Sequence, residues 1–115
     1  MDIKCTTEKK EDILVFKILQ NEVNHNNAAS LKEKLFLEIA DGNNKIVLDL
    51  ENVNELDSSA LGALLFGKRQ ANNAGGNLVL VSVSPQIQTL LRIAQLSRVY
   101  EMFATVTKAV EFFQK

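Results

Sequence analysis

The feature that most constrains the fold is residues 46–65, where an apolar run leads through a short polar loop into a helical pattern. The run 46–50 has the continuous apolar character of a strand buried on both faces. Asp57, Ser58 and Ser59 follow at the place where helices are capped, just before the next apolar run. This order predicts that the serines lie at a helix N-terminus, where free N–H groups and the helix dipole favour negative charge.

A serine hydroxyl in that position has two possible roles, and they imply different functions. It can cap the helix, which is the ordinary role at a strand–helix junction and the one that spacing alone favours. It can instead accept a phosphate, which would make the helix start a regulated site. If Ser58 caps the helix, we expect Ser58→Ala to cost about 0.5–2 kcal/mol.

The rest of the hydrophobic pattern predicts an opening hairpin followed by alternating strands and helices. The order is ββαβαβαβα, an α/β domain over residues 1–115 with a mixed sheet of about five strands and helices packed mainly on one face. The predicted strands are 3–8, 12–19, 45–50, 77–83 and 98–103, and the predicted helices are 28–40, 58–73, 85–95 and 105 onward.

The helix predicted over 58–73 carries three stripes at helical spacing. One stripe holds Ser58, Gly62, Phe66, Arg69 and Asn73. On it, Phe66 either wraps over the edge of the core or forms an exposed anchor for a partner. On the second interpretation, Gly62 lets that partner come close. The leucine stripe is the expected core face, and a stripe of small residues permits close approach of a neighbouring element; these two are Leu61, Leu64 and Leu65, and Ala60, Ala63, Gly67, Ala71 and Ala74.

Composition excludes several classes of protein. Thirteen basic and fourteen acidic side chains give a net charge of −1, which does not indicate a nucleic-acid partner. Cys5 is the only cysteine, so an internal disulfide and a cysteine-based metal cluster are excluded. No apolar run approaches the roughly 20 residues that cross a bilayer. We therefore expect a small cytoplasmic domain without membrane insertion.

Enzyme chemistry also finds little support in the sequence. His25 is the only histidine and has no cysteine or carboxylate at ligand spacing, so a structural or solvated role is expected. Asp49 and Asp57 suggest comparison with phospho-aspartate receivers, but the preceding strand ends without the second carboxylate cluster that would hold Mg²⁺. Asp49 then fits a hydrogen-bonded structural carboxylate. The expectation is a binding protein with no cofactor and no metal.

These motifs together carry a family likeness. The strand 46–50 is followed by Asp-Ser-Ser-Ala-Leu-Gly at 57–62, with Gly75-Gly76 and Ser84-Pro85 behind it. This arrangement resembles the STAS domain of bacterial anti-sigma factor antagonists, and the resemblance covers essentially the whole chain.

The resemblance implies a partner switch. In that family the serine directly after the aspartate, here Ser58, is phosphorylated by a serine kinase that also acts as an anti-sigma factor. The unphosphorylated antagonist binds the anti-sigma factor, phosphorylation breaks the complex, and a PP2C-type phosphatase restores it. The antagonist itself catalyses nothing.

The chain departs from the family pattern at three positions. Ala60 stands where glycine is common, Asn24 where an aspartate is often found, and Phe66 where smaller residues are common. Apolar helix faces and an edge strand would also support a weak homodimer. An alternative function is a non-switching STAS accessory subunit of a lipid-transport ABC system or of a sensory assembly. The residues expected to contact the partner are Asp57, Ser59, Ala60, Gly62, Phe66, Arg69 and Asn24.

Overall fold

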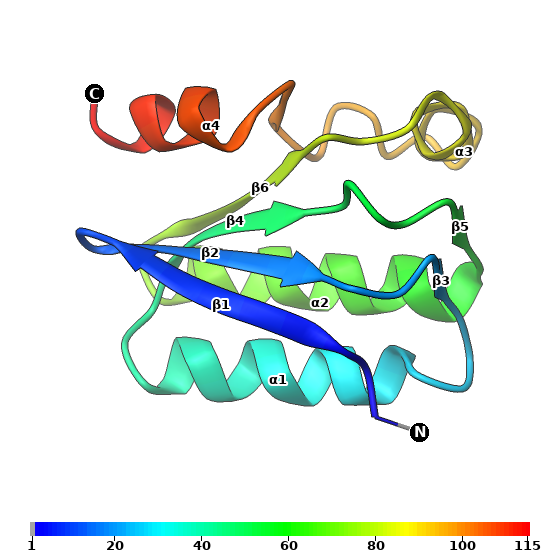
Figure 1. Cartoon of the computed structure of the whole chain (residues 1–115), viewed down its shortest axis with the longest axis horizontal. Helices are drawn as coiled ribbons and strands as arrows, with labels where there is room; N and C mark the ends of the chain where they lie inside the picture. The colour runs from blue at the N-terminus through cyan, green and yellow to red at the C-terminus, as the bar shows by residue number, and fades with distance from the viewer. Residues whose placement is uncertain (1) are drawn as a thin grey trace.

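The computed structural model describes residues 2–115 and contains the mixed five-stranded sheet that the sequence predicts. An opening hairpin pairs the first two strands in antiparallel fashion, through a turn where Glu11 has a φ of 60°. The later strands join in parallel, so the spatial order is β1-β2-β4-β6-β7 (Figure 1). The strands are β1 (Cys5–Lys10), β2 (Ile13–Ile18), β4 (Lys45–Asp49), β6 (Asn77–Val81) and β7 (Met102–Phe103).

The helices form layers on both faces of this sheet. The two long helices, α1 (Ala28–Ala40) and α2 (Ser58–Asn73), lie side by side under one face, as expected. The short helix α4 (Val106–Phe113) covers the opposite face, and α3 (Pro85–Ile93) lies beyond the end of β6 (Figure 1). Because the central strands are covered on both sides, their sequences are continuously apolar.

The sheet therefore has two hydrophobic cores. The larger one fills the space between the sheet and the two long helices, and includes the fully buried Leu48 and Leu80. The smaller one packs Ala109 of α4 against β-branched side chains of the central strands, among them Val47 and Val79. Neighbouring positions along one strand thus serve opposite cores, as the alternation of side chains in a strand requires.

On α2, the small residues rather than the leucines form the main core face. Four of the five residues in the predicted small stripe are buried, whereas Leu61 and Leu65 are only half-buried and Leu64 alone of the leucines is fully enclosed. The reason is close packing: a Cβ on Gly67 would lie 2.9 Å from Leu35 Cδ1 on α1. The expectation of close approach is confirmed. The expected leucine stripe is confirmed for Leu64, while Leu61 and Leu65 pack against the same core without being fully enclosed.

Two short strands were not expected from the sequence. β3 (Glu22–Val23) and β5 (Glu55–Leu56) pair in parallel as a separate small sheet beside the start of α2. At the other end of the sequence, the strand expected over 98–103 is reduced to the two residues of β7. The remaining predicted strands and helices are present, with boundaries that differ by no more than two residues.

Candidate functional site

Asp57, not a serine, caps the helix that opens the candidate site. Its Oδ1 accepts a hydrogen bond of 2.9 Å from the backbone N–H of Ala60, three residues further on. Its backbone is extended, with φ −104° and ψ −174°, as at an ordinary N-cap. The cap therefore falls one residue before Ser58, which is the first residue of α2.

The two serines are thereby left without a capping role. Both are exposed at the first turn of α2. Across residues 2–115, the Ser58 hydroxyl makes no hydrogen bond. The hydroxyl is available to a second protein at the end of the helix where the dipole favours an added negative charge.

The second oxygen of the Asp57 carboxylate holds a distant loop. Oδ2 accepts a hydrogen bond of 2.9 Å from the backbone N–H of His25 and lies 3.6 Å from His25 Nδ1. The N–H of Ala60 and then that of His25 favour the charged carboxylate, so the pKa of Asp57 lies below its ordinary value despite opposing desolvation. The imidazole itself is 76% exposed, in line with the expected solvated histidine.

Asparagines build the loop that brings His25 to Asp57. Asn24 Oδ1 accepts a hydrogen bond from the N–H of Asn26 at 2.9 Å, and Asn24 O accepts one from Ala28 at the start of α1. Asn27 is buried, and its side chain accepts from Asn24 N–H and donates to the carbonyl of Glu22. Asn24 is thus a half-buried loop residue near the serines; the sequence did not reveal the roles of Asn27 and His25.

The outer face of α2 carries most of the predicted contact residues. Gly62 and Arg69 are exposed, on the stripe that begins at Ser58. Phe66 is half-buried, and Lys32 of α1 lies over its ring with Nζ 4.9 Å from the centroid. Phe66 is therefore neither fully exposed nor a core residue, and its ring is partly covered by Lys32. Lys32 was not singled out from the sequence.

Ala60 does not belong to this exposed surface. Its side chain has no exposed area and packs in the larger core. Its expected contact with a partner is therefore corrected: the methyl group points inward, and only the backbone N–H of Ala60 takes part in the site, through Asp57. The physical reason is the helical register, which turns position 60 toward the sheet while 58 and 59 face outward.

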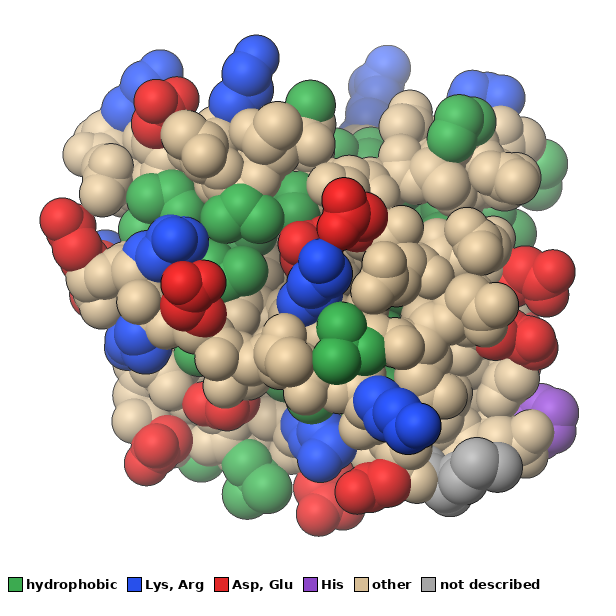
Figure 2. All heavy atoms as spheres, in the orientation of Figure 1, with side chains coloured by type: hydrophobic (Ala, Val, Ile, Leu, Met, Phe, Trp, Pro, Cys, Tyr) green, Lys and Arg blue, Asp and Glu red, His purple; other side chains and the backbone are tan. Residues whose placement is uncertain are grey.

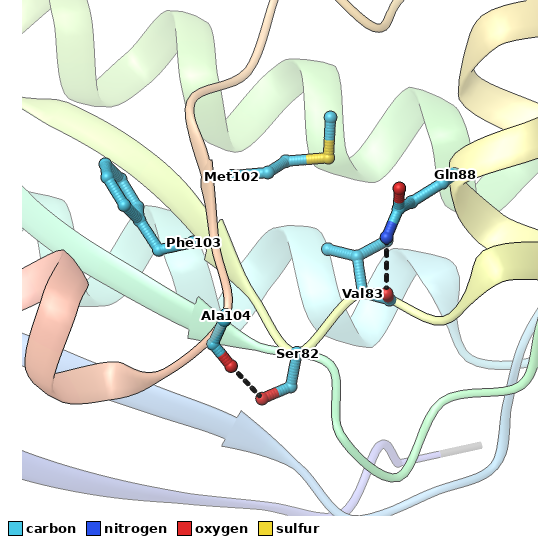
Figure 3. A pocket seen from close by; sticks show the side chains of 6 residues that line it. All are labelled: Ser82, Val83, Gln88, Met102, Phe103 and Ala104. Atoms are coloured by element: carbon cyan, nitrogen blue, oxygen red, sulfur yellow. Dashed lines mark hydrogen bonds between the residues drawn. The ribbon is translucent and has the colours of Figure 1, made fainter.

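A separate hollow of about 420 Å³ lies between the ends of β6 and β7 and α3 (Figure 3). Its polar side chains are engaged with backbone carbonyls: Ser82 Oγ donates to Ala104 O at 3.4 Å, and Gln88 Nε2 donates to Val83 O at 2.9 Å. None of the residues predicted for the site lines this hollow. The serine site is instead an exposed helix end outside this hollow.

Other chemistry is sparse in the part of the chain that the structure describes. Within residues 2–115, no three His, Cys, Asp or Glu side chains are placed to hold a metal ion. Asp49 is buried, and its Oδ1 accepts a hydrogen bond of 2.9 Å from the backbone of Glu51, as expected of a structural carboxylate. The face seen in Figure 2 mixes basic and acidic side chains. None of the helices within residues 2–115 combines the length and the apolar character that crossing a membrane requires.

Comparison with known proteins gives one consistent result. Residues 4–109 match the model of the STAS domain. A Thermotoga neapolitana protein named "Putative anti-sigma factor antagonist TM1081 homolog" is 31% identical over 105 residues, which cover 90% of this chain and 92% of that protein. The crystal structure of a Thermotoga maritima protein of the same description is similar with a TM-score of 0.88 at 26% identity, covering 96% of this chain and 95% of that one.

The fold is also shared with a protein whose phosphorylated form has been solved. The phosphorylated Bacillus cell fate determinant SpoIIAA superimposes with a TM-score of 0.72 at 22% identity, over 94% of this chain and 97% of that chain. At this identity the likeness concerns the fold alone.

Proposed function

The chain belongs to the STAS domain family, and on that premise we propose that it is an anti-sigma factor antagonist that acts by partner switching. The unphosphorylated form binds an anti-sigma factor that is also a serine kinase. Phosphorylation of Ser58 releases the complex, and a PP2C-type phosphatase reverses the modification. In this role residues 1–115 act as one STAS domain in the cytoplasm, as a substrate and binding module that contributes no catalytic group.

The observation that carries the proposal is the separation of two tasks at the start of α2. Asp57 caps the helix with one oxygen and anchors the loop of His25 with the other. Ser58 has an exposed hydroxyl without a hydrogen bond in residues 2–115. A kinase can therefore modify Ser58 without removing a contact that holds the fold together.

The surroundings of Ser58 explain why a phosphate would change binding rather than folding. A phosphoserine adds about −1.5 to −2 charges at neutral pH. The free N–H groups and the dipole at the start of α2 accommodate that charge. The adjacent carboxylate of Asp57 and any acidic surface on the partner would be repelled. The proposed contact surface comprises Asp57, Ser58, Ser59, Gly62, Phe66, Arg69 and the loop of Asn24.

The first test is phosphosite mapping by intact mass and peptide analysis of the protein isolated from its native cell in several growth states. We expect a single phosphate that disappears in Ser58→Ala and persists in Ser59→Ala, which is the matched control because Ser59 is exposed on the same turn. If Ser58 stays unmodified in every growth state, the non-switching accessory role takes the place of this proposal.

The second test separates charge from the loss of the hydroxyl. The tagged chain and its Ser58→Glu and Ser58→Gln variants are compared for thermal unfolding and for capture of the same native partner, identified by mass spectrometry. We expect all three to fold, because a carboxylate at a helix N-terminus is tolerated. We expect Ser58→Glu alone to lose the partner; a Ser58→Glu protein that binds as tightly as the unmodified chain contradicts the charge switch.

A further inference from the structure

The open edge of the sheet is β1, whose outward backbone groups can be assigned. In an antiparallel pair, residues alternate between bonding the neighbouring strand and facing away from it. Leu19 N–H donates to Lys4 O at 2.8 Å, so the even-numbered residues of β1 bond to β2. The N–H and C=O groups of Cys5, Thr7 and Lys9 therefore point outward. Within residues 2–115 no strand pairs with this side of β1.

An exposed apolar side chain lies next to this edge. Leu37 of α1 is 56% exposed. Together with Cys5 and Thr7 of β1, and with Lys34 and Glu38 of its own helix, it lines a hollow of about 240 Å³. The same side of the molecule thus presents unpaired backbone groups and a leucine in water, and Figure 1 shows β1 running along α1 on the side nearest the viewer.

We propose that the chain forms a weak homodimer in which β1 pairs with β1 of a second copy, antiparallel, about a two-fold axis at Thr7. An axis perpendicular to the sheet keeps each side chain on its own face. Odd-numbered residues of β1 must then lie opposite odd-numbered ones, and even opposite even, so the numbers of two paired residues add to an even sum. With Thr7 opposite Thr7, Cys5 lies opposite Lys9 and the outward groups of all three residues find partners. Registers centred one or two residues further along place Glu8 opposite Glu8 or Lys9 opposite Lys9, which repel.

The helices next to β1 fit the same axis. Because α1 lies beside β1, the two-fold axis places the two copies of α1 side by side and antiparallel, with the Leu37 side chains near the axis. Lys34 of each copy then approaches the C-terminal end of the other helix at Asp41, where the dipole favours a cation. The exposed leucine is covered and Lys34 faces Asp41, while the two Glu38 side chains, which line the same hollow, bring like charges near the axis and keep the association weak.

Two lysines of β1 explain why the association would be weak but possible. Lysines on an edge strand oppose pairing with another chain. Here Lys9 donates to Asn43 Oδ1 and Lys10 lies 3.6 Å from Glu8, so each cation has a partner in its own chain, which reduces the repulsion without removing it. The dimer would leave the start of α2 open, because α2 packs on β6, at the far side of the sheet from β1.

The test is sedimentation equilibrium of the whole chain from micromolar to millimolar concentration. We expect the mass to rise from that of the monomer toward twice that value. Thr7→Pro should remain monomeric throughout, because proline removes an N–H that would bond to the second copy. The fold should tolerate this change, because no strand of the same chain uses that N–H. Thr7→Val is the matched control and should associate like the unmodified chain. A chain that is monomeric at every concentration, or a dimer that persists in Thr7→Pro, overturns the proposal.

A cross-linking experiment tests the register even if Thr7→Pro folds poorly. In the background Cys5→Ser, Thr7→Cys is compared with Lys9→Cys under mild oxidation. Hydrogen-bonded antiparallel partners have Cα atoms about 5.5 Å apart, within the range of a disulfide. We expect the disulfide between two copies of Thr7→Cys to form at least ten times faster than the disulfide between two copies of Lys9→Cys. Equal rates, or a faster Lys9→Cys, contradict the axis at Thr7.

Discussion

Asp57 Oδ2 accepts a hydrogen bond of 2.9 Å from the backbone N–H of His25, so the residue that caps α2 also fixes the loop before α1. The two segments are 32 residues apart in the sequence. Through this one carboxylate, the start of α2 and the loop of Asn24 form a single unit. A change in the charge near Asp57 would therefore act both on the start of α2 and on the loop of Asn24.

The first prediction assigns stability to Asp57 rather than to Ser58. Asp57→Ala removes both the cap of α2 and the tie to His25, so we expect the thermal midpoint to fall by about 5 °C. Ser58→Ala removes an exposed hydroxyl and should change the free energy of unfolding by less than about 0.5 kcal/mol. Thermal and urea unfolding of both variants measure this. A larger loss in Ser58→Ala than in Asp57→Ala would show that the serine is the cap.

The second prediction concerns pH and the Asp57 carboxylate. Because its pKa is lowered in the folded state, chiefly by the N–H of Ala60, folding is favoured by the charged form. That contribution is fully present above the unfolded pKa of about 3.9 and is lost as the pH falls through the lower folded value.

Asp57→Asn isolates this effect, since asparagine still caps a helix but cannot ionise. We expect the unmodified chain to be more stable than Asp57→Asn at pH 7, and the gap to narrow progressively below pH 4. Urea unfolding across that range measures the gap. A gap that is constant with pH would mean that the carboxylate charge contributes nothing at this site.

Much of the fold could be predicted because its signals are local. The helices 28–40 and 58–73 have the bounds that periodicity and punctuation indicate, and Gly42 follows α1 with a φ of 100°, as a helix-terminating glycine should. Ser84 caps α3 by accepting from Ile87 N–H at 3.2 Å. Such features depend on a few neighbouring residues, which a sequence shows directly.

The features that escaped prediction depend on distant parts of the chain. The contact of His25 with Asp57 and the pairing of β3 with β5 join segments about thirty residues apart. The core face of α2 extends beyond the predicted leucine stripe for a related reason. Leucines normally mark a buried stripe, but the nearness of α1 at Gly67 leaves room only for small side chains. The helical register also buries Ala60, although the sequence predicts this residue on the contact surface.

The third prediction concerns a partly buried cation on α2. Lys68 Nζ donates to Glu101 Oε1 at 2.9 Å and to the carbonyl of Leu78 at 3.4 Å. Although partial burial opposes it, this contact holds the pKa of Glu101 below its ordinary value. Removing Glu101 leaves the ammonium group of Lys68, only 11% exposed, without its counter-charge, whereas replacing Lys68 by an apolar side chain leaves a carboxylate that water can still hydrate.

We therefore expect Glu101→Ala to lower the free energy of unfolding by about 1–3 kcal/mol, and Lys68→Met by less than about 1 kcal/mol. The cost of Glu101→Ala stays within this range because the Glu101 side chain is 44% exposed and water screens the ion pair. Urea unfolding of the two variants and of the double variant measures the coupling. If Lys68→Met proves the more damaging change, its bonds to Asn77 and Leu78, and not the ion pair, hold α2 in place.

The last prediction separates stability from binding at Gly62. A Cβ at Gly62 would meet nothing within 4 Å, and the residue lies inside α2 on its exposed face. Replacing an exposed glycine in a helix by alanine should raise the free energy of unfolding by about 0.5–1 kcal/mol. If the partner approaches this face closely, the added methyl group should weaken the complex although the free chain becomes more stable.

Gly76→Ala is the contrasting change, because its Cβ would lie only 1.9 Å from the carbonyl oxygen of Asn44. That variant should lose at least about 2 kcal/mol of stability, since backbone cannot move aside cheaply. Any loss of partner capture by Gly76→Ala would follow from unfolding, whereas a loss by the more stable Gly62→Ala can only arise at the interface. Paired unfolding curves and capture assays measure both quantities. A Gly62→Ala chain that is more stable and binds unchanged would move the partner away from the outer face of α2.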